Sequence, residues 1–307
     1  MVLDSALEEA ELLESTLELD SDFHFGIFDP SRLQSSRLDD AERLIEEIKR
    51  ALLDGSLPAF MASVLVLPKP EEIAAEARAV FLAETSLQQL NPYELAHPGN
   101  AIMRISRDIE YCLYKRAELR RRATEVVRIL AGGGADLVTS VVRGFPALDA
   151  MFLSASQQRK NRAGLSFESH IAAILRAGRI RFEAQAVTGG RRPDFVLPSV
   201  AELNKGEARP FDAAMVLSLK TTLRERWKQV SMEKFSSALF LATVDDRVTS
   251  AAINDMNGQG ICLVVPESLK QSKETCYPGN GNVISFRDFF DEEVARRRPF
   301  LLLPLAS

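Results

Sequence analysis

Apolar and polar positions follow two different periods along this chain, and the change lies near residue 150. In residues 38–53 apolar side chains recur every three or four positions among charged ones, which is the period of an amphipathic helix. The same spacing predicts helices at residues 5–19, 71–84 and 102–130. Residues 61–67 form an apolar run whose pattern fits a strand and a buried helical turn equally well.

Beyond residue 150 short apolar runs alternate with helical segments. Residues 164–177 predict a helix, and residues 180–187 alternate as a half-buried strand does. Further strands are predicted at 194–197, 215–219, 239–244 and 261–265, and further helices at 222–235, 248–256 and 286–297. This alternation is typical of an α/β layer structure around a largely buried sheet. We therefore expect a mainly helical region over 1–150 and an α/β domain over 151–307.

Composition and charge restrict the classes of function. The chain has 307 residues, of which 46% are hydrophobic and 26% charged, and its net charge is −5. A chain of this charge is not a polybasic nucleic-acid binder as a whole, so any DNA-binding surface must be local. Positive charge gathers at 115–122, 159–162, 191–192 and 224–228. The run at 115–122 fits a phosphate-binding face and a solvated helix face equally well.

The cysteines and the absence of targeting signals indicate the compartment. Three cysteines stand at wide spacing without a CxxC motif, so we expect neither a disulfide framework nor a zinc site. The acidic N-terminal stretch lacks the layout of a signal peptide. No apolar run approaches the roughly 20 residues that a membrane span needs. The sequence therefore predicts a soluble cytoplasmic protein without a membrane partner.

The segment from residue 191 to residue 233 favours metal-dependent cleavage of a phosphodiester. This chemistry needs oxygen ligands for a divalent cation, an activated water and an offset for charge on the phosphate. Asp194 opens a short strand directly after Pro193. Lys220 directly follows the apolar strand predicted at 215–219, which would hold its stem and bring the ammonium group to the edge of the sheet. An acid and a lysine so placed predict a site at one sheet edge.

These residues match the PD-(D/E)XK nuclease pattern with one substitution. In the usual pattern an acid stands two residues before the lysine, but here that position is Ser218, which is a poor magnesium ligand. The helix predicted at 222–235 offers a replacement. At about 100° per residue, Leu223, Trp227 and Val230 form an apolar stripe toward the sheet. Glu233 lies on the flank of that stripe, from which it could reach a metal ion.

Three segments of the chain together resemble one family. They are RKNRAGLSFESH at 159–170, LKTTLRERWKQ at 219–229 and GQGICLVVPESL at 258–269. They resemble, in the same order, segments of the EcoRII C-terminal type of type II restriction endonuclease, in the branch that reads sites containing CC and GG (NgoMIV is a more distant relative). That branch carries a displaced acid thirteen residues after the lysine, the separation between Lys220 and Glu233. The resemblance covers about residues 150–290.

The resemblance implies a fold and a set of catalytic roles. The fold would be a PD-(D/E)XK nuclease core, a mixed central sheet flanked by helices, preceded by a mainly helical N-terminal region. Asp194 and Glu233 would hold Mg²⁺, and Lys220 would be the catalytic lysine. Glu168 would be an accessory acid, which binds the metal directly or through water.

The resemblance also implies which residues read the DNA bases. Arg224, Glu225 and Arg226 match the R-(D/E)-R element of the family, which reads G·C pairs. The chemistry agrees, because arginine binds guanine O6 and N7 with two hydrogen bonds and a carboxylate accepts one from cytosine N4. Glu225 also has the spacing of a capping box with Thr222, and the two roles are compatible.

Each candidate also has a purely structural role open to it. Asp194 could pair with Arg191 or Arg192 at a turn. Lys220 could extend from the end of its strand into solvent, and Glu168 could be an ordinary surface residue of its helix. Asp194, Lys220 and Glu233 stand at the spacing of the family, however, and this favours the catalytic interpretation of Asp194 and Lys220.

The sequence therefore predicts a magnesium-dependent type II restriction endonuclease of a restriction–modification system. Its substrate would be double-stranded DNA with a short palindromic site, in which the CC and GG halves abut or are separated by a central base pair. A palindrome implies a homodimer, and a tetramer stays open. Residues 1–150 are expected to supply dimer and DNA contacts. Two alternatives are a repair or structure-specific nuclease of the same fold and a catalytically silent DNA-binding protein.

Overall fold

The computed structural model describes residues 30–64, 66–132, 136–185, 193–223, 227–228 and 237–304. Within these ranges the chain forms two compact units, one from residues 1–67 and 115–160 and the other from residues 68–114 and 161–307. This division differs from the split expected between residues 150 and 151. Residues 68–114 belong with the sheet because their apolar side chains, such as Phe81 and Ile102, are buried in its core.

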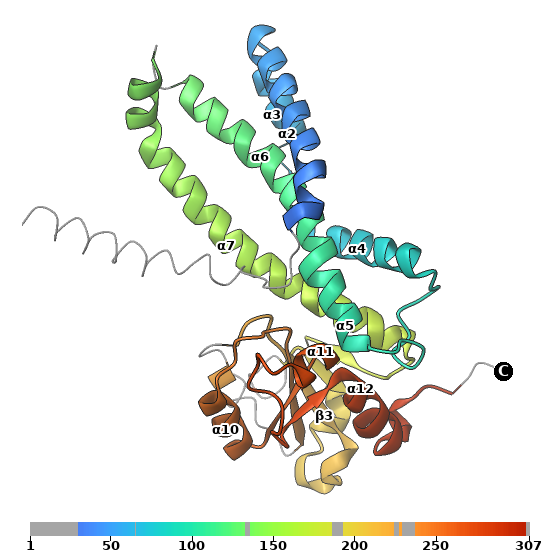
Figure 1. The fold of residues 1–307 in the computed structure, drawn as a ribbon. Coiled ribbons are helices and arrows are strands. Elements are labelled where there is room, and N and C mark those ends of the chain that lie inside the picture. Colours follow the sequence, from blue (N-terminus) through green and yellow to red (C-terminus); the bar gives the residue numbers. More distant parts are fainter. Residues whose placement is uncertain are drawn as a thin grey trace, which may run out of the picture. The chain divides into compact units, whose positions relative to one another are not determined.

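The first unit is helical throughout its described part. Its elements are α2 (Pro30–Leu53), α3 (Leu57–Val64), most of α6 (Glu110–Ala131) and the first half of α7 (Leu137–Ala177) (Figure 1). The apolar run at 61–67 lies in α3 as far as Val64, so its first part is helix. The stripe predicted for 38–53 is buried only in part: Leu44 and Ile48 are buried, whereas Leu53 is 87% exposed.

The basic run at 115–122 is paired with acids inside the helical unit. Arg116 lies 2.8 Å from Asp40 and Arg120 lies 2.6 Å from Glu47, and both acids are on α2. Further contacts within α6 and between α6 and α7 are Lys115–Glu118 at 3.1 Å, Arg159–Glu118 at 2.7 Å and Arg122–Gln158 at 2.9 Å. Much of the positive charge of this run is therefore engaged within the protein, which favours a structural role over phosphate binding.

The second unit is built on a mixed sheet. Its described strands, in spatial and chain order, are β1 (Glu183–Ala184), β2 (Phe195–Leu197), β3 (Met215–Leu219), β4 (Ala238–Ala242), β5 (Ile261–Val265) and β6 (Val283–Ser285). β2 is antiparallel to β1 and to β3, and β3 to β6 are parallel. β3 and β5 match their predicted bounds, β1 is shorter than predicted, and β6 was not predicted. The predicted α/β core with a mixed sheet is confirmed.

Short and long helices surround this sheet. They are α4 (Pro70–Thr85), α5 (Pro98–Met103), α8 (Val200–Leu203), α10 (Ser250–Gly258), α11 (Glu267–Gln271), α12 (Phe286–Asp288), the second half of α7, and two π-helical segments, η2 (Arg104–Ile109) and η6 (Phe289–Arg296). Three 3₁₀ turns complete the described elements, η3 (Gly206–Ala208), η4 (Phe211–Ala213) and η7 (Pro299–Leu301). The helix predicted at 102–130 thus runs through α5, η2 and α6, and the helix predicted at 286–297 consists of α12 and η6.

Both faces of the sheet are buried in apolar cores. Successive residues alternate between them: Phe195 and Leu197 of β2 pack with α4, α5, α7 and η6, whereas Val196 packs with α8, α10 and α11. The apolar residues of β3 to β6 follow the same alternation, whereas both residues of β1 are exposed. A sheet covered on both faces needs apolar residues at every strand position, which explains the continuous apolar runs in the sequence.

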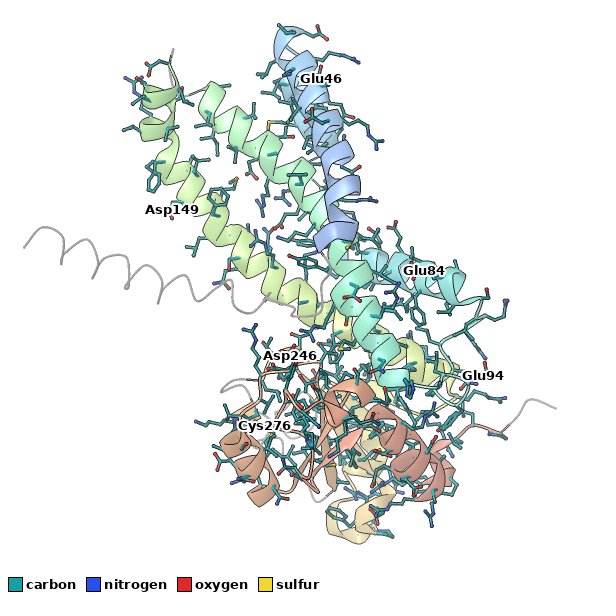
Figure 2. All side chains as sticks on the ribbon, viewed as in Figure 1. Glu46, Glu84, Glu94, Asp149, Asp246 and Cys276 are labelled. Carbon is teal, nitrogen blue, oxygen red and sulfur yellow. The ribbon has the colours of Figure 1, made fainter. Side chains whose placement is uncertain are left out.

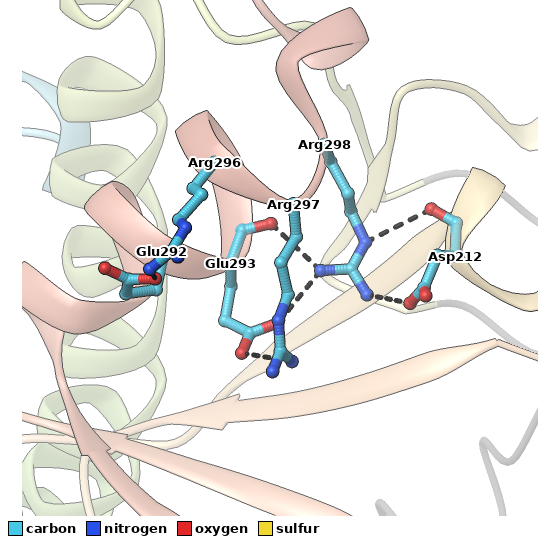
Figure 3. A network of polar contacts seen from close by, with 6 residues as sticks. All are labelled: Asp212, Glu292, Glu293, Arg296, Arg297 and Arg298. Atoms are coloured by element: carbon cyan, nitrogen blue, oxygen red, sulfur yellow. Dashed lines mark hydrogen bonds and ion pairs between the residues drawn. The ribbon is translucent and has the colours of Figure 1, made fainter.

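A buried arginine joins the C-terminal helix to the approach to β3. Arg298 is 1% exposed, and its guanidinium donates to the side chain of Asp212 and, at 3.1 Å, to its carbonyl oxygen (Figure 3). It also donates to the carbonyl oxygen and to Oε2 of Glu293, each at 2.9 Å. Two carboxylates therefore compensate the buried charge, as a buried cation requires.

A buried carboxylate holds two helix starts together. Glu267 accepts hydrogen bonds from the backbone N–H groups of Gly99 at 3.2 Å and Asn100 at 2.9 Å, at the start of α5. It accepts a third from the N–H of Arg287, at the start of α12, at 2.9 Å. Such N–H groups lack partners inside their own helices, so the negative charge of Glu267 stabilises both helices.

Gly99→Ala is expected to destabilise this junction. A Cβ at residue 99 would lie 2.7 Å from Cα of Pro266 and 2.7 Å from Cδ2 of Phe286. We expect the free energy of unfolding, measured by urea denaturation, to fall by about 1–3 kcal/mol. The matched control is Gly258→Ala on α10, where an added Cβ meets nothing within 4 Å. The control should be neutral or slightly stabilising, and equal stability of both variants would contradict the close packing at Gly99.

Candidate active site

Asp194 and Lys220 lie together at one end of the sheet. β2 and β3 are antiparallel, so the residue before β2 and the residue after β3 meet at the same edge. Nζ of Lys220 lies 3.5 Å from Oδ2 of Asp194, and their side chains are 21% and 17% exposed. The structure thus brings these two predicted residues into one partly accessible site.

The main chain of β3 holds both charged groups. Oδ2 of Asp194 accepts a hydrogen bond from the backbone N–H of Leu219 at 2.6 Å, and Nζ of Lys220 donates to the carbonyl oxygen of Leu219 at 2.9 Å. The backbone N–H of Lys220 donates to Ala242 on β4 at 3.1 Å, so the lysine backbone is fixed as well. No described residue donates a hydrogen bond to Oδ1 of Asp194, which leaves that oxygen for a further partner.

Ser218 lies next to Asp194 across the sheet. Phe195 pairs with Leu217, so the register extended by one residue places Asp194 opposite Ser218. Ser218 is fully buried, and its hydroxyl does not replace the carboxylate of the usual motif. Within the described ranges no group of three or more His, Cys, Asp or Glu residues is suited to hold a metal ion.

Glu168 reaches this site through Gln185. Nε2 of Gln185 donates a hydrogen bond to Oε2 of Glu168, and its backbone N–H donates to the carbonyl oxygen of Asp194 at 2.8 Å. One residue therefore joins the two acids, one on α7 and the other before β2.

A buried histidine fixes the part of α7 that carries Glu168. Nε2 of His170 lies 2.6 Å from Oε2 of Glu110, and its Nδ1 lies 3.2 Å from Nη1 of Arg78. Arginine is only a donor, so Nδ1 accepts from Arg78 and the proton lies on Nε2, which donates to Glu110. Burial lowers the pKa of Arg78, an effect that the charge of Glu110 opposes. This network orients the helix without using Glu168 itself.

The helix predicted after Lys220 is described in part. Residues 227–228 are helical, and Leu223 and Trp227 are buried against the sheet, which confirms the apolar stripe at these two positions. The displaced acid and the base-reading residues lie outside the described residues: Glu233, Arg224, Glu225 and Arg226. Their roles stay predictions.

Asp245, in the loop after β4, holds the backbone at Leu223. Its Oδ2 accepts the backbone N–H of Leu223 at 2.7 Å, and its Oδ1 accepts that of Arg247 at 2.9 Å. The hydroxyl of Tyr277 donates to the carbonyl oxygen of Asp245. Burial, followed by the charges of Asp245 and Asp246, raises the pKa of Tyr277 above its ordinary value, so the phenol stays a neutral donor.

Asp245 and Gln185 are the two site residues that the sequence does not reveal. Each acts through a hydrogen bond to a residue far away in the chain, Leu223 or Glu168. The available signal is weak: a polar residue near the end of a strand. Many such residues are ordinary turn residues.

Comparison with known proteins places this arrangement in a family. The profile of the family described as "EcoRII C terminal" matches residues 136–290. The type II restriction enzyme EcoRII of Escherichia coli is 33% identical over 157 residues, which span 49% of this chain and 39% of that enzyme. The type II restriction enzyme SsoII of Shigella sonnei is 29% identical over 158 residues, which span 48% of this chain and 50% of that enzyme. The matches thus span half or less of these curated relatives.

Solved structures share the fold over most of the chain. Metal-depleted Ecl18kI in complex with uncleaved DNA superposes with a TM-score of 0.64 at 21% identity, over 82% of this chain and 88% of that one. The PspGI–substrate DNA complex superposes with a TM-score of 0.54 at 22% identity, over 74% of this chain and 92% of that one. At these identities the likeness concerns the fold.

Proposed function

Since the chain belongs to the EcoRII C-terminal family, we propose that it is a type II restriction endonuclease that cuts double-stranded DNA at a specific site. The observation that carries this proposal is the pair of Asp194 and Lys220, 3.5 Å apart at the edge of the sheet. Two curated relatives are named as type II restriction enzymes, and two structural neighbours are DNA complexes.

Mg²⁺ is the proposed cofactor, and the residues of the site fit it. Asp194 offers a carboxylate oxygen that no described residue engages, and Gln185 brings Glu168 near it. Glu233 is proposed as the second ligand. Mg²⁺ typically takes one or two carboxylates and keeps several waters, so a protein cluster of three ligands is not needed. When bound, Mg²⁺ supplies Lewis-acid stabilisation of the phosphate and lowers the pKa of a water.

Lys220 performs the part of the chemistry that needs a fixed positive charge. The carbonyl oxygen of Leu219 and the carboxylate of Asp194 hold its ammonium group at the sheet edge. A phosphate bound beside Asp194 would meet this charge, which offsets the negative charge that develops during cleavage or orients the attacking water. Each active site would cut one strand and leave a 5′-phosphate and a 3′-hydroxyl.

The proposed substrate is a short palindrome that contains CC and GG, abutting or separated by a central base pair. Arg224, Glu225 and Arg226 are proposed to read it in the major groove, since arginine and carboxylate side chains match guanine and cytosine edges. Asp245 supports this role, because it fixes the backbone at Leu223, directly before these residues. We place the enzyme in the cytoplasm, where its DNA substrate is found.

A palindromic site has two-fold symmetry, and a protein with the same symmetry can read both halves alike, so we propose a homodimer. The first half of α7 supplies a surface for it. Apolar side chains stand exposed there at spacings of three, four and seven residues, as in a helix that packs against another helix: Val138, Val141, Phe145 and Phe152. A contiguous apolar patch of this kind marks an interaction site.

Two charged side chains also stand exposed on the first half of α7. Arg143 and Asp149 are exposed and have no ion-pair partner among the described residues, and Asp149 points away from α6 (Figure 2). At about 100° per residue, Asp149 lies beside the apolar face and Arg143 lies on the opposite side of the helix, so it is the two-fold symmetry of the proposed palindrome that favours a second copy as the occupant. Among the described helices α7 is also the one that is long and apolar enough to cross a membrane. A bilayer is therefore the alternative occupant.

A plasmid with many CC- and GG-containing sites tests the proposed activity. Incubation with Mg²⁺ should give discrete fragments, and incubation with EDTA should give none. Asp194→Ala should abolish cutting and spare specific binding, because it removes a metal ligand and no base contact. Asp255→Ala, at an exposed aspartate of α10, is the control and should cut normally. A smear or structure-dependent nicking would favour a repair nuclease, and tight binding without any cutting would contradict both nuclease assignments.

Arg226→Ala tests the assignment of the base readers. It should reduce discrimination between the true site and sites altered at one base pair by about 1–3 kcal/mol, since one bidentate contact to guanine is lost. The measurement compares kcat/KM for both duplexes at fixed salt. Arg296→Ala, at an exposed arginine of η6, should leave this ratio unchanged. If Arg226→Ala leaves binding and site preference intact, the assignment is wrong.

Phe145→Glu tests the dimer surface. A charge on the apolar face should convert the dimer to a monomer in sedimentation experiments, because it would be buried without a partner. Phe211→Glu is the control: this phenylalanine is 60% exposed, close to the 63% of Phe145, but lies outside α7. A monomeric wild type, or one that floats with liposomes, would contradict the dimer surface.

A further inference from the structure

We infer that Gln185 is a positioning residue of the cleavage site, which holds the accessory acid Glu168 beside Asp194. The inference rests on the proposed nuclease function. It adds a residue to the site that the acid–lysine pattern does not contain, and it gives Glu168 a defined place in the geometry.

The sheet fixes the backbone of Gln185 next to Asp194. β1 and β2 pair with Glu183 opposite Val196 and Ala184 opposite Phe195, so the next pair in this register is Gln185 with Asp194. The backbone hydrogen bond agrees with this register, because the N–H of Gln185 donates to the carbonyl oxygen of Asp194 at 2.8 Å. Any movement of the strand that carries Asp194 therefore moves Gln185 with it.

The backbone of Gln185 has an unusual conformation for its residue type. Its φ angle is +49°, in the left-handed region that glycine adopts easily and other residues adopt at a cost of about 1 kcal/mol or more. β1 ends at Ala184, directly before this turn. Strain of this kind persists where the surroundings hold the residue, and here hydrogen bonds hold both its backbone and its side chain.

The side-chain amide of Gln185 suits the task of orienting an acid that must stay charged. An ionised carboxylate only accepts hydrogen bonds, so the amide nitrogen faces Oε2 of Glu168. A lysine or arginine at this position would also orient Glu168, but its charge would compete with a metal ion for the carboxylate. A neutral donor fixes the acid and leaves its charge available, as the outer partners of metal ligands commonly do.

The backbone of α7 is fixed on both sides of Glu168. Phe167 packs into the core and His170 is bonded to Glu110, so the helix itself is anchored on both sides of the acid. A glutamate side chain still has several rotamers, and holding one of them costs entropy at each binding event. The hydrogen bond from Gln185 selects one rotamer before a metal ion binds.

Gln185→Ala tests this role by the dependence of cleavage on Mg²⁺ concentration. The Mg²⁺ concentration for half-maximal cleavage should rise roughly 10-fold or more, as when an outer partner of a metal ligand is lost. Gln185→Asn tolerates a positive φ but is one methylene shorter, so it should resemble Gln185→Ala. Gln259→Ala, at an exposed glutamine after α10, is the matched control and should behave as the wild type.

A second measurement records metal binding without cleavage. In chains that carry Lys220→Ala and are bound to uncleaved site DNA, calorimetry with Mn²⁺ should show roughly 10-fold weaker binding when Gln185→Ala is added. The melting temperatures should stay equal to that of the control. Unchanged Mn²⁺ affinity and Mg²⁺ dependence would overturn the inference, as would a loss that only follows a lower melting temperature. If the wild type itself cuts no site, the proposed function fails rather than this role.

Discussion

Burial of the central sheet on both faces is the constraint on which the rest of the structure depends. The apolar residues of β2 to β6 enter one of two apolar cores, where an unpaired charge would cost several kcal/mol. Charged groups must therefore stand at strand ends, where backbone groups need partners and solvent can enter. Asp194 and Lys220 occupy two such ends, and the antiparallel pairing of β2 with β3 places them at the same edge.

Two residues outside β2 and β3 help to fix the groups at this edge of the sheet. Gln185, after β1, bonds to Asp194 and Glu168, and Asp245, after β4, bonds to the backbone at Leu223. The hydrogen bonds of Gln185 join the two acids, and the hydrogen bond of Asp245 fixes the segment that leads to the proposed base readers. If those readers contact DNA as proposed, the segment that leads to them and the catalytic edge are both fixed by residues that follow β1 and β4, the strands on either side of β2 and β3.

The sequence predicts the elements whose burial is uniform and misses those set by distant contacts. β3 and β5 are continuous apolar runs, and their bounds agree with the prediction. α7 begins at Leu137, well before the predicted start at residue 164; the helix runs through Gly144 and Pro146, and Gly144 allows Ile129 of α6 to approach closely. The pairing of Asp194 with Lys220 follows from strand order, whereas the bonds of Gln185 depend on tertiary structure that no local pattern encodes.

The serine in place of the usual acid follows from the same constraint. Ser218 is fully buried and stands opposite Asp194 in the register, where cross-strand side chains lie on the same face and close together. A carboxylate at residue 218 would be buried beside a second negative charge, and only a bound cation could compensate it. Serine removes this repulsion from the metal-free protein. A displaced acid later in the chain, as proposed for Glu233, would restore the missing ligand.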